Sequence, residues 1–190
     1  NIHWYAPFAG NVATDIIVNS DGSINIGQSM ESPILPMLRA GVRLGISKDF
    51  RNVKWYGRGP EEAYCDRKTG QRIAEFSKKA DELCHHYMRP QENGNRTDVR
   101  SLEMTDDSGY GFRISSRYPF DFSVHQYSQE KLEKAMHDYE LTPDEYYTLC
   151  IDDRQRGVGG DMPGSACLHE PYKMHRGSYS FAFRIEEVQK

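Results

Sequence analysis

Charged side chains of both signs are concentrated in the segment 52–67. It places two arginines among three carboxylates: Arg58, Arg67, Glu61, Glu62 and Asp66. Carboxylates at such spacing can act as general acid and base, but guanidinium groups beside them favour bidentate ion pairs that hold a chain corner rigid. We interpret the segment as a structural corner held by these ion pairs.

The backbone around these charges supports that interpretation. Residues 53–56, which include Trp55, are β-branched, aromatic or long, as in a half-buried strand. Gly57 and Gly59 allow backbone angles closed to other residues, and Pro60 fixes its own φ. The sequence therefore predicts a strand that runs into a tight corner, with Tyr64 beyond it.

Residues 90–96 form a second polar group, Pro-Gln-Glu-Asn-Gly-Asn-Arg. Gln91, Glu92, Asn93 and Asn95 offer donors and acceptors of the kind that bind sugar hydroxyls. The same side chains commonly satisfy backbone groups within a loop. We favour this structural role and keep sugar binding as the alternative.

A glycine-rich group, Arg-Gly-Val-Gly-Gly-Asp, occupies residues 156–161. Clustered glycines permit a backbone to approach a ligand or a neighbouring chain closely. No Gly-Lys-Ser/Thr follows and no helical pattern begins after it, so this is not a phosphate-binding loop. We expect residues 157–165 to be exposed and mobile in the isolated chain, since they combine four glycines with a proline.

Histidines and cysteines give weaker signals. His169 precedes Glu170, and such a pair can act as acid and base, but single histidines are more often surface groups. The four cysteines are far apart and no Cys-x-x-Cys pair occurs, so we expect no metal site. The cysteines also leave the redox state open.

Several of these motifs, in this order, resemble the C-terminal small-chain domain of the large β-galactosidases of glycoside hydrolase family 2. The matching stretches cover the chain from about residue 35 to its end and comprise 55–67 (Trp-Tyr-Gly-Arg-Gly-Pro-Glu-Glu-Ala-Tyr-Cys-Asp-Arg), 89–100, 127–137 and 155–161. The resemblance implies a structural motif made of Trp55, Arg58, Glu62, Tyr64, Asp66, Arg67, Glu92 and Asn93.

In that family the glycine-rich loop reaches the sugar site, and a Trp shortly after Gly-Gly-Asp lines it. The resemblance therefore makes substrate-loop candidates of Gly159, Gly160, Asp161, Met162 and Gly164. No Trp follows here, so either another residue such as Met162 contacts the sugar, or the parent enzyme prefers a different glycoside.

The resemblance also implies that this chain has no catalytic residue. A retaining glycosidase uses two carboxylic acids about 5 Å apart, and in this family they lie in a preceding (β/α)8 barrel. We expect no cofactor in this chain, while the parent enzymes often use Mg and Na bound elsewhere. The expected partners are the preceding domains, above all the barrel, and a galactoside or related sugar. Neither nucleic acid nor membrane is expected, and oligomers would form through the parent enzyme.

The elements that position these motifs are mostly short strands. Alternating or β-branched runs predict strands over 12–18, 24–26, 39–46, 53–56, 72–77, 99–104, 111–115, 120–124, 146–152 and 178–185. One segment has a helical period instead. Ser128 can cap a helix whose apolar face holds Leu132, Ala135, Met136 and Tyr139. We therefore predict an all-β fold with one short helix, an antiparallel β-sandwich. By resemblance this is the supersandwich also seen in galactose mutarotases.

Composition agrees with one globular domain over residues 1–190. The net charge of −4 argues against non-specific nucleic-acid binding, and no apolar run is long enough to span a membrane. No signal peptide is visible and position 1 is not Met, so we expect a piece of a longer chain and leave the compartment open between cytoplasm and periplasm.

Two alternatives from other functional classes remain. A stand-alone carbohydrate-binding module would need an exposed aromatic platform, for which Trp4 or Trp55 would have to face solvent. A sugar epimerase of the mutarotase type rests on fold analogy alone.

Overall fold

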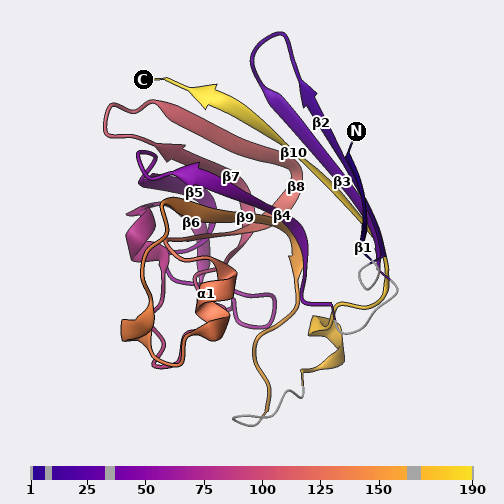
Figure 1. Ribbon diagram of the computed structural model, residues 1–190, viewed down its shortest axis with the longest axis vertical. Coiled ribbons are helices and arrows are strands. Elements are labelled where there is room, and N and C mark those ends of the chain that lie inside the picture. Colours follow the sequence, from indigo (N-terminus) through magenta and orange to yellow (C-terminus); the bar gives the residue numbers. More distant parts are fainter. Residues whose placement is uncertain (1, 7–9, 33–36, 162–167, 190) are drawn as a thin grey trace.

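The computed structural model describes residues 2–6, 10–32, 37–161 and 168–189, and its strands pair antiparallel throughout (Figure 1). The strands are β1 (Ile2–Ala6), β2 (Gly10–Val18), β3 (Ile24–Ser32), β4 (Arg39–Ser47), β5 (Asn52–Gly59), β6 (Arg72–Lys79), β7 (Arg96–Thr105), β8 (Gly111–His125), β9 (Tyr146–Gln155) and β10 (Gly177–Val188). The described helical segments are α1 (Gln129–Lys134) and the 3₁₀ turns η1 (Ala80–Leu83), η2 (Asp138–Glu140) and η3 (Glu170–Tyr172). The predicted all-β class with one short α-helix is confirmed.

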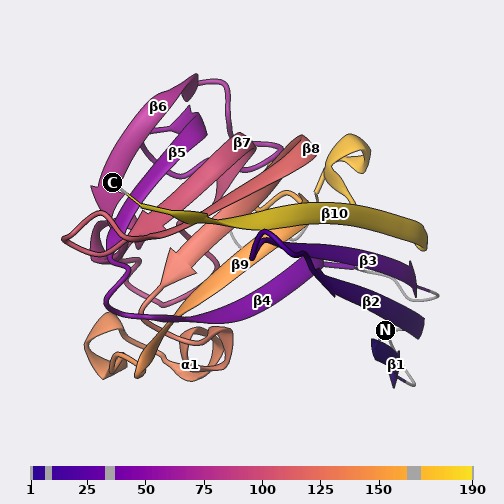
Figure 2. The same ribbon diagram turned by 90° about the horizontal axis from the view of Figure 1, so that it is seen from above.

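The sheet branches at β8, the longest strand. Its first part pairs with β10, which leads through β3 and β2 to β1; its last part pairs with β9, which leads to β4. On its other side β8 pairs with β7, followed by β5 and β6. The two branches separate beyond β8 and curve around a common interior, which gives the layered arrangement of a sandwich (Figure 2).

Pro119 explains how one strand can serve both branches. The sequence predicts two strands at 111–115 and 120–124, and that division is wrong because β8 runs continuously from Gly111 to His125. The pairing with β10 ends at Ser115 and the pairing with β9 begins at Asp121. Since proline has no N–H to donate, it fits the interval where β8 changes partner.

Apolar and polar or small residues alternate along β10, and the apolar side chains face the interior. Its four apolar side chains at every second position, Tyr179, Phe181, Phe183 and Ile185, are more buried than Ser178, Ser180 and Ala182 between them. Phe183 lies opposite Ile26, which lies opposite Ile16 on β2. Apolar residues therefore form rows across three strands, and the row ends at the exposed Ile16.

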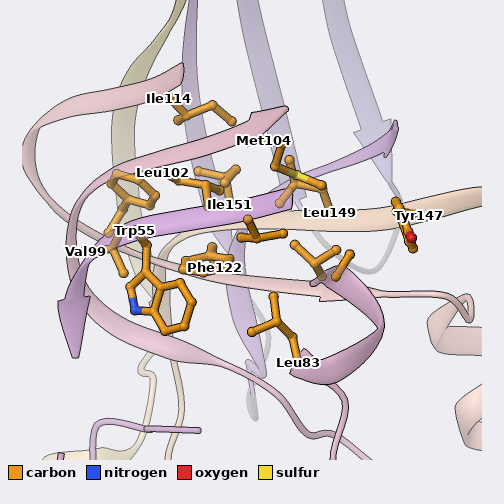
Figure 3. Packing of buried hydrophobic residues seen from close by; sticks show 14 of the residues in the cluster. Trp55, Leu83, Val99, Leu102, Met104, Ile114, Phe122, Tyr147, Leu149 and Ile151 are labelled. Atoms are coloured by element: carbon orange, nitrogen blue, oxygen red, sulfur yellow. The ribbon is translucent and has the colours of Figure 1, made fainter. Parts of the chain in front are cut away.

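The interior is filled by buried side chains from β3, β5, β7, β8, β9, β10 and η1 (Figure 3). Leu102 and Met104 of β7, Ile114 of β8 and Leu149 and Ile151 of β9 are each 0% exposed. Leu83 of η1 packs in the same cluster. Because these residues are far apart in sequence, the core joins both branches into one packed unit.

The helix is shorter than predicted. α1 ends at Lys134, Ala135 is already extended, and Met136 and Tyr139 are 54% and 82% exposed, so the predicted four-residue apolar face is wrong at its second half. The carboxylate of Glu140 accepts a hydrogen bond from the backbone N–H of Met136 at 2.9 Å, which replaces a helical bond. Ser128 precedes the helix, but its side chain makes no capping bond.

None of the helices in the described residues is long and apolar enough to span a membrane.

The core predicts a clear difference between two leucines. Leu102→Ala should lower the free energy of unfolding by about 2–5 kcal/mol, because it leaves a cavity in a fully buried site. Leu38 is 62% exposed, and Leu38→Ala should change it by no more than about 0.5 kcal/mol. Urea denaturation of the two variants measures both values; equal losses would contradict the assigned core.

Candidate functional site

Trp55 lies in the middle of β5, and its side chain supports the corner that follows the strand. Its indole is 1% exposed, and Nε1 donates a hydrogen bond to the carbonyl oxygen of Arg58 at 2.9 Å. The guanidinium carbon of Arg96 lies 5.5 Å from the centre of the indole. Trp55 therefore fixes the corner from inside and is not available to solvent.

Arg96 is buried and binds three backbone carbonyl groups. Nη1 donates to Gly94 at 2.6 Å and to Leu83 at 3.2 Å, and Nη2 donates to Pro60 at 3.1 Å. Burial lowers the pKa of Arg96 to about 10, so the side chain stays protonated at neutral pH. One cation thus joins the corner, the polar loop and η1.

Arg58 does not pair with the corner carboxylates as predicted. Its Nε lies 2.5 Å from Asp98 Oδ2 on the neighbouring strand β7, and Lys68 Nζ lies 3.0 Å from the same oxygen. Nη1 of Arg58 also donates to the carbonyl oxygen of Gln71 at 2.7 Å. Arg58 meets Asp98 because β5 pairs with β7, which brings this carboxylate, distant in sequence, next to the guanidinium group.

Glu62 makes the corner ion pair that the sequence predicts, with Arg67. The same carboxylate accepts hydrogen bonds from the Tyr87 hydroxyl at 2.5 Å and from the Gly94 backbone N–H at 2.8 Å. Glu61 points elsewhere and pairs with Lys78 at 2.9 Å. Glu62 therefore ties the corner to the loop 90–96.

The side chains of that loop bind protein groups. Asn93 accepts a hydrogen bond from the His85 backbone N–H at 2.9 Å and donates to the Gln91 carbonyl oxygen at 2.9 Å. Asn95 donates to the carbonyl oxygen of Ala63 at 3.0 Å. Glu92 contacts the Tyr64 hydroxyl at 3.4 Å and Arg39 at 3.4 Å. These contacts agree with the structural role.

Two carboxylates that the sequence analysis does not single out, Asp121 on β8 and Asp152 on β9, lie opposite each other. Burial and the neighbouring charge of Asp152 raise the pKa of Asp121 to about 8. Burial also raises the pKa of Asp152 to about 6, although Arg39 opposes the shift. A signal was present, because each aspartate stands next to apolar residues inside a strand pattern.

The glycine-rich loop leaves β9 beside the corner. Gly157 is buried, which corrects the expectation of exposure at this position, whereas Gly159, Gly160 and Asp161 are exposed. Asp66 Oδ2 accepts a hydrogen bond from the Gly159 backbone N–H at 2.7 Å. Two further candidates, Met162 and Gly164, lie outside the described residues.

The histidines are spread over several places. His169 Nε2 lies 2.7 Å from Asp161 Oδ1, and Glu170 pairs with Lys173. His125 is buried, and its Nε2 donates to the carbonyl oxygen of Asn93 at 2.9 Å. Burial lowers the pKa of His125 to about 4 and keeps it neutral. Within the described ranges no three His, Cys, Asp or Glu side chains are arranged to hold a metal ion.

A family model and individual relatives both match β-galactosidases. The family model for the β-galactosidase small chain matches residues 3–185. A β-galactosidase of Priestia megaterium is 36% identical over 89% of the chain, and one of Halalkalibacterium halodurans is 34% identical over 88%. The β-galactosidase BgaC of Bifidobacterium adolescentis is 34% identical over 91% of the chain. The chain spans about 17%, 17% and 16% of these three relatives, respectively.

We expect Arg58→Ala to destabilise the chain by about 1 kcal/mol or more, because it removes charged hydrogen bonds from a partly buried position. Arg43→Ala is the matched control, since Arg43 and Glu130 form an exposed ion pair, and it should cost no more than about 0.5 kcal/mol. Denaturant midpoints measure both effects. Coincident midpoints for Arg58→Ala and the parent chain would mean that Arg58 contributes nothing.

Asp121 should make stability fall as pH rises from about 6.5 to about 8. In this window the folded state keeps a proton on Asp121, while the unfolded state, with an ordinary aspartate pKa near 4, has lost it. The free energy of unfolding should therefore decline by up to about 1.4 kcal/mol per pH unit, and Asp121→Asn should abolish this decline.

Asp107→Asn is the control for this titration. Its hydrogen bonds with Arg51 and Asn52 lower the pKa of Asp107 to about 2, so it is ionised throughout the window. Urea denaturation at half-unit intervals of pH measures the slopes. Parallel curves for the parent chain and Asp121→Asn would refute the raised pKa.

Proposed function

Because the chain belongs to the β-galactosidase small-chain family, we propose that it is the non-catalytic C-terminal domain of an enzyme that hydrolyses terminal β-galactosides. The observation that carries this proposal is the family match over residues 3–185, in a chain that spans only about 17% of its first two relatives. In the proposal residues 1–190 form one domain. The remaining polypeptide supplies the acid and the nucleophile, and also binds Mg and Na where the enzyme uses them.

The glycine-rich loop is the part of this domain that we assign to the rim of the sugar site. Gly159, Gly160 and Asp161 are exposed at the end of β9, and the Asp161 carboxylate can accept hydrogen bonds from sugar hydroxyls. The corner supports the loop through Asp66, and Glu62 in turn ties the corner to the loop 90–96. In this arrangement a few exposed atoms of the loop would contact the substrate, while the corner holds the loop in place.

An exposed apolar surface on β2 supports a role within a larger polypeptide. Ile16 and Val18 lie on one face of the strand and are 48% and 70% exposed, and Ile17, 56% exposed, lies on the other face. The ribbon of β2 and β3 extends beyond the rest of the sheet at the turn that joins the two strands (Figure 1). Adjacent exposed apolar residues of this kind are typical of surfaces that contact another domain. We propose that the preceding domains of the same polypeptide cover them.

A stand-alone carbohydrate-binding module is less well supported. Trp55, one of its two candidate platforms, is 1% exposed and lies against Phe76 and Phe122. A buried indole cannot stack on a sugar, so the module would depend on Trp4.

Activity measurements with a chromogenic β-galactoside test the proposed division of labour. The complete polypeptide should turn over the substrate, and the purified 190-residue chain should show none, because it lacks the acid and the nucleophile. Turnover by the purified chain that disappears when one of its own carboxylates is substituted would overturn the proposal.

The loop assignment is tested separately in the complete polypeptide. Asp161→Ala should raise KM about fivefold, the equivalent of one lost hydrogen bond of about 1 kcal/mol. Asp107→Ala, at an exposed turn between β7 and β8, should leave KM unchanged. An unchanged KM for Asp161→Ala would remove Asp161 from the sugar site.

A further inference from the structure

Asp66 forms the side-chain connection between the corner and the glycine-rich loop. Its Oδ2 accepts the Gly159 backbone N–H at 2.7 Å across a sequence separation of 93 residues. Past Gly157, the described part of the loop has one other hydrogen bond, between Asp161 and His169. The hydrogen bond to Asp66 therefore connects the exposed end of the described loop to the corner.

Gly157 shows how closely the loop approaches this carboxylate. A Cβ atom at Gly157 would lie 2.5 Å from Asp66 Oδ2 and 2.6 Å from Asp66 Cγ, and also 2.8 Å from Cδ1 of the Leu168 side chain. Gly157 is not among the glycines with positive φ, so the backbone itself would accept alanine. What glycine provides here is space for Asp66.

The start of the loop is held by backbone groups and not by particular side chains. Arg156 N–H donates to the Leu38 carbonyl oxygen at 2.9 Å, and Gly157 N–H donates to the Tyr172 carbonyl oxygen at 2.9 Å. These bonds fix residues 156–157, and the next fixed point is Gly159 on Asp66. Asp66 therefore holds the loop at Gly159, and the next contact along it is the one between Asp161 and His169.

We propose that Asp66 is a positioning residue of the sugar site: it anchors the glycine-rich loop at Gly159 so that the exposed residues beyond it meet the substrate. This inference rests on the proposed function for the part that concerns the substrate. The anchor itself is a property of this domain and can be tested without substrate.

Hydrogen exchange of the complete polypeptide, followed by mass spectrometry of peptides that cover 157–161, tests the anchor. Asp66→Ala should speed exchange at the Gly159 amide at least about tenfold, because the amide loses its acceptor. Asp66→Asn retains an acceptor oxygen and should stay close to the parent. Glu61→Ala removes a neighbouring carboxylate that binds Lys78 and should change nothing. Unchanged exchange in Asp66→Ala would overturn the inference.

Steady-state kinetics of the same proteins test the consequence for substrate. Asp66→Ala should raise KM several-fold with a smaller change in kcat, and Asp66→Asn should restore most of the affinity. Faster exchange with unchanged kinetics would leave the anchor in place, and would overturn both the loop's assignment to the sugar site and the positioning role of Asp66.

Gly157→Ala provides an independent variant if Asp66→Ala does not fold. Its methyl group meets the Asp66 carboxylate, so it should also speed exchange at Gly159 and raise KM. In the double variant with Asp66→Ala, the two effects should be less than multiplicative, because both act through one contact. Fully multiplicative effects, or no effect of Gly157→Ala, would contradict the proposed anchor.

Discussion

The buried guanidinium of Arg96 is the group on which the polar side of this domain depends. It lies against Trp55 and donates to carbonyl groups of Pro60, Leu83 and Gly94, which belong to three different segments. A buried cation is costly unless its donors are occupied. The positions of the corner, the loop 90–96 and η1 are therefore interdependent, since each supplies an acceptor that the others cannot replace.

Around this cation, the acidic side chains act mainly as connectors between segments. Glu62 joins the corner to the loop 90–96, Asp98 joins β7 to the corner through Arg58 and Lys68, and Asp66 joins the corner to the glycine-rich loop. Each carboxylate accepts bonds from groups far away in sequence. Such an arrangement holds the exposed loop on the rigid sheet beneath it, which agrees with the proposed contact between this loop and a sugar site completed by the rest of the polypeptide.

The strands could be predicted because apolar residues alternate in β10, β-branched residues cluster in β2, and β4 and β5 combine β-branched with other apolar or aromatic residues, as strands commonly do. The continuous β8 was missed, since a proline inside a strand pattern usually marks its end, and only the change of partner strand at Pro119 removes the need for its N–H. The end of α1 was missed for a similar reason. The apolar period continues through Met136 and Tyr139, but the Glu140 side chain takes over a backbone N–H.

For the candidate site, too, some features could be predicted from the sequence and others could not. The class of fold, the corner, the polar and glycine-rich loops and the family resemblance follow from residue type, spacing and order along the chain, and could be predicted from these. The folded structure was needed to show which polar groups meet: Arg58 with Asp98, Asp66 with the Gly159 N–H, and Asp121 opposite Asp152. These partners are set by which strands lie side by side, and strand order depends on how the whole core packs.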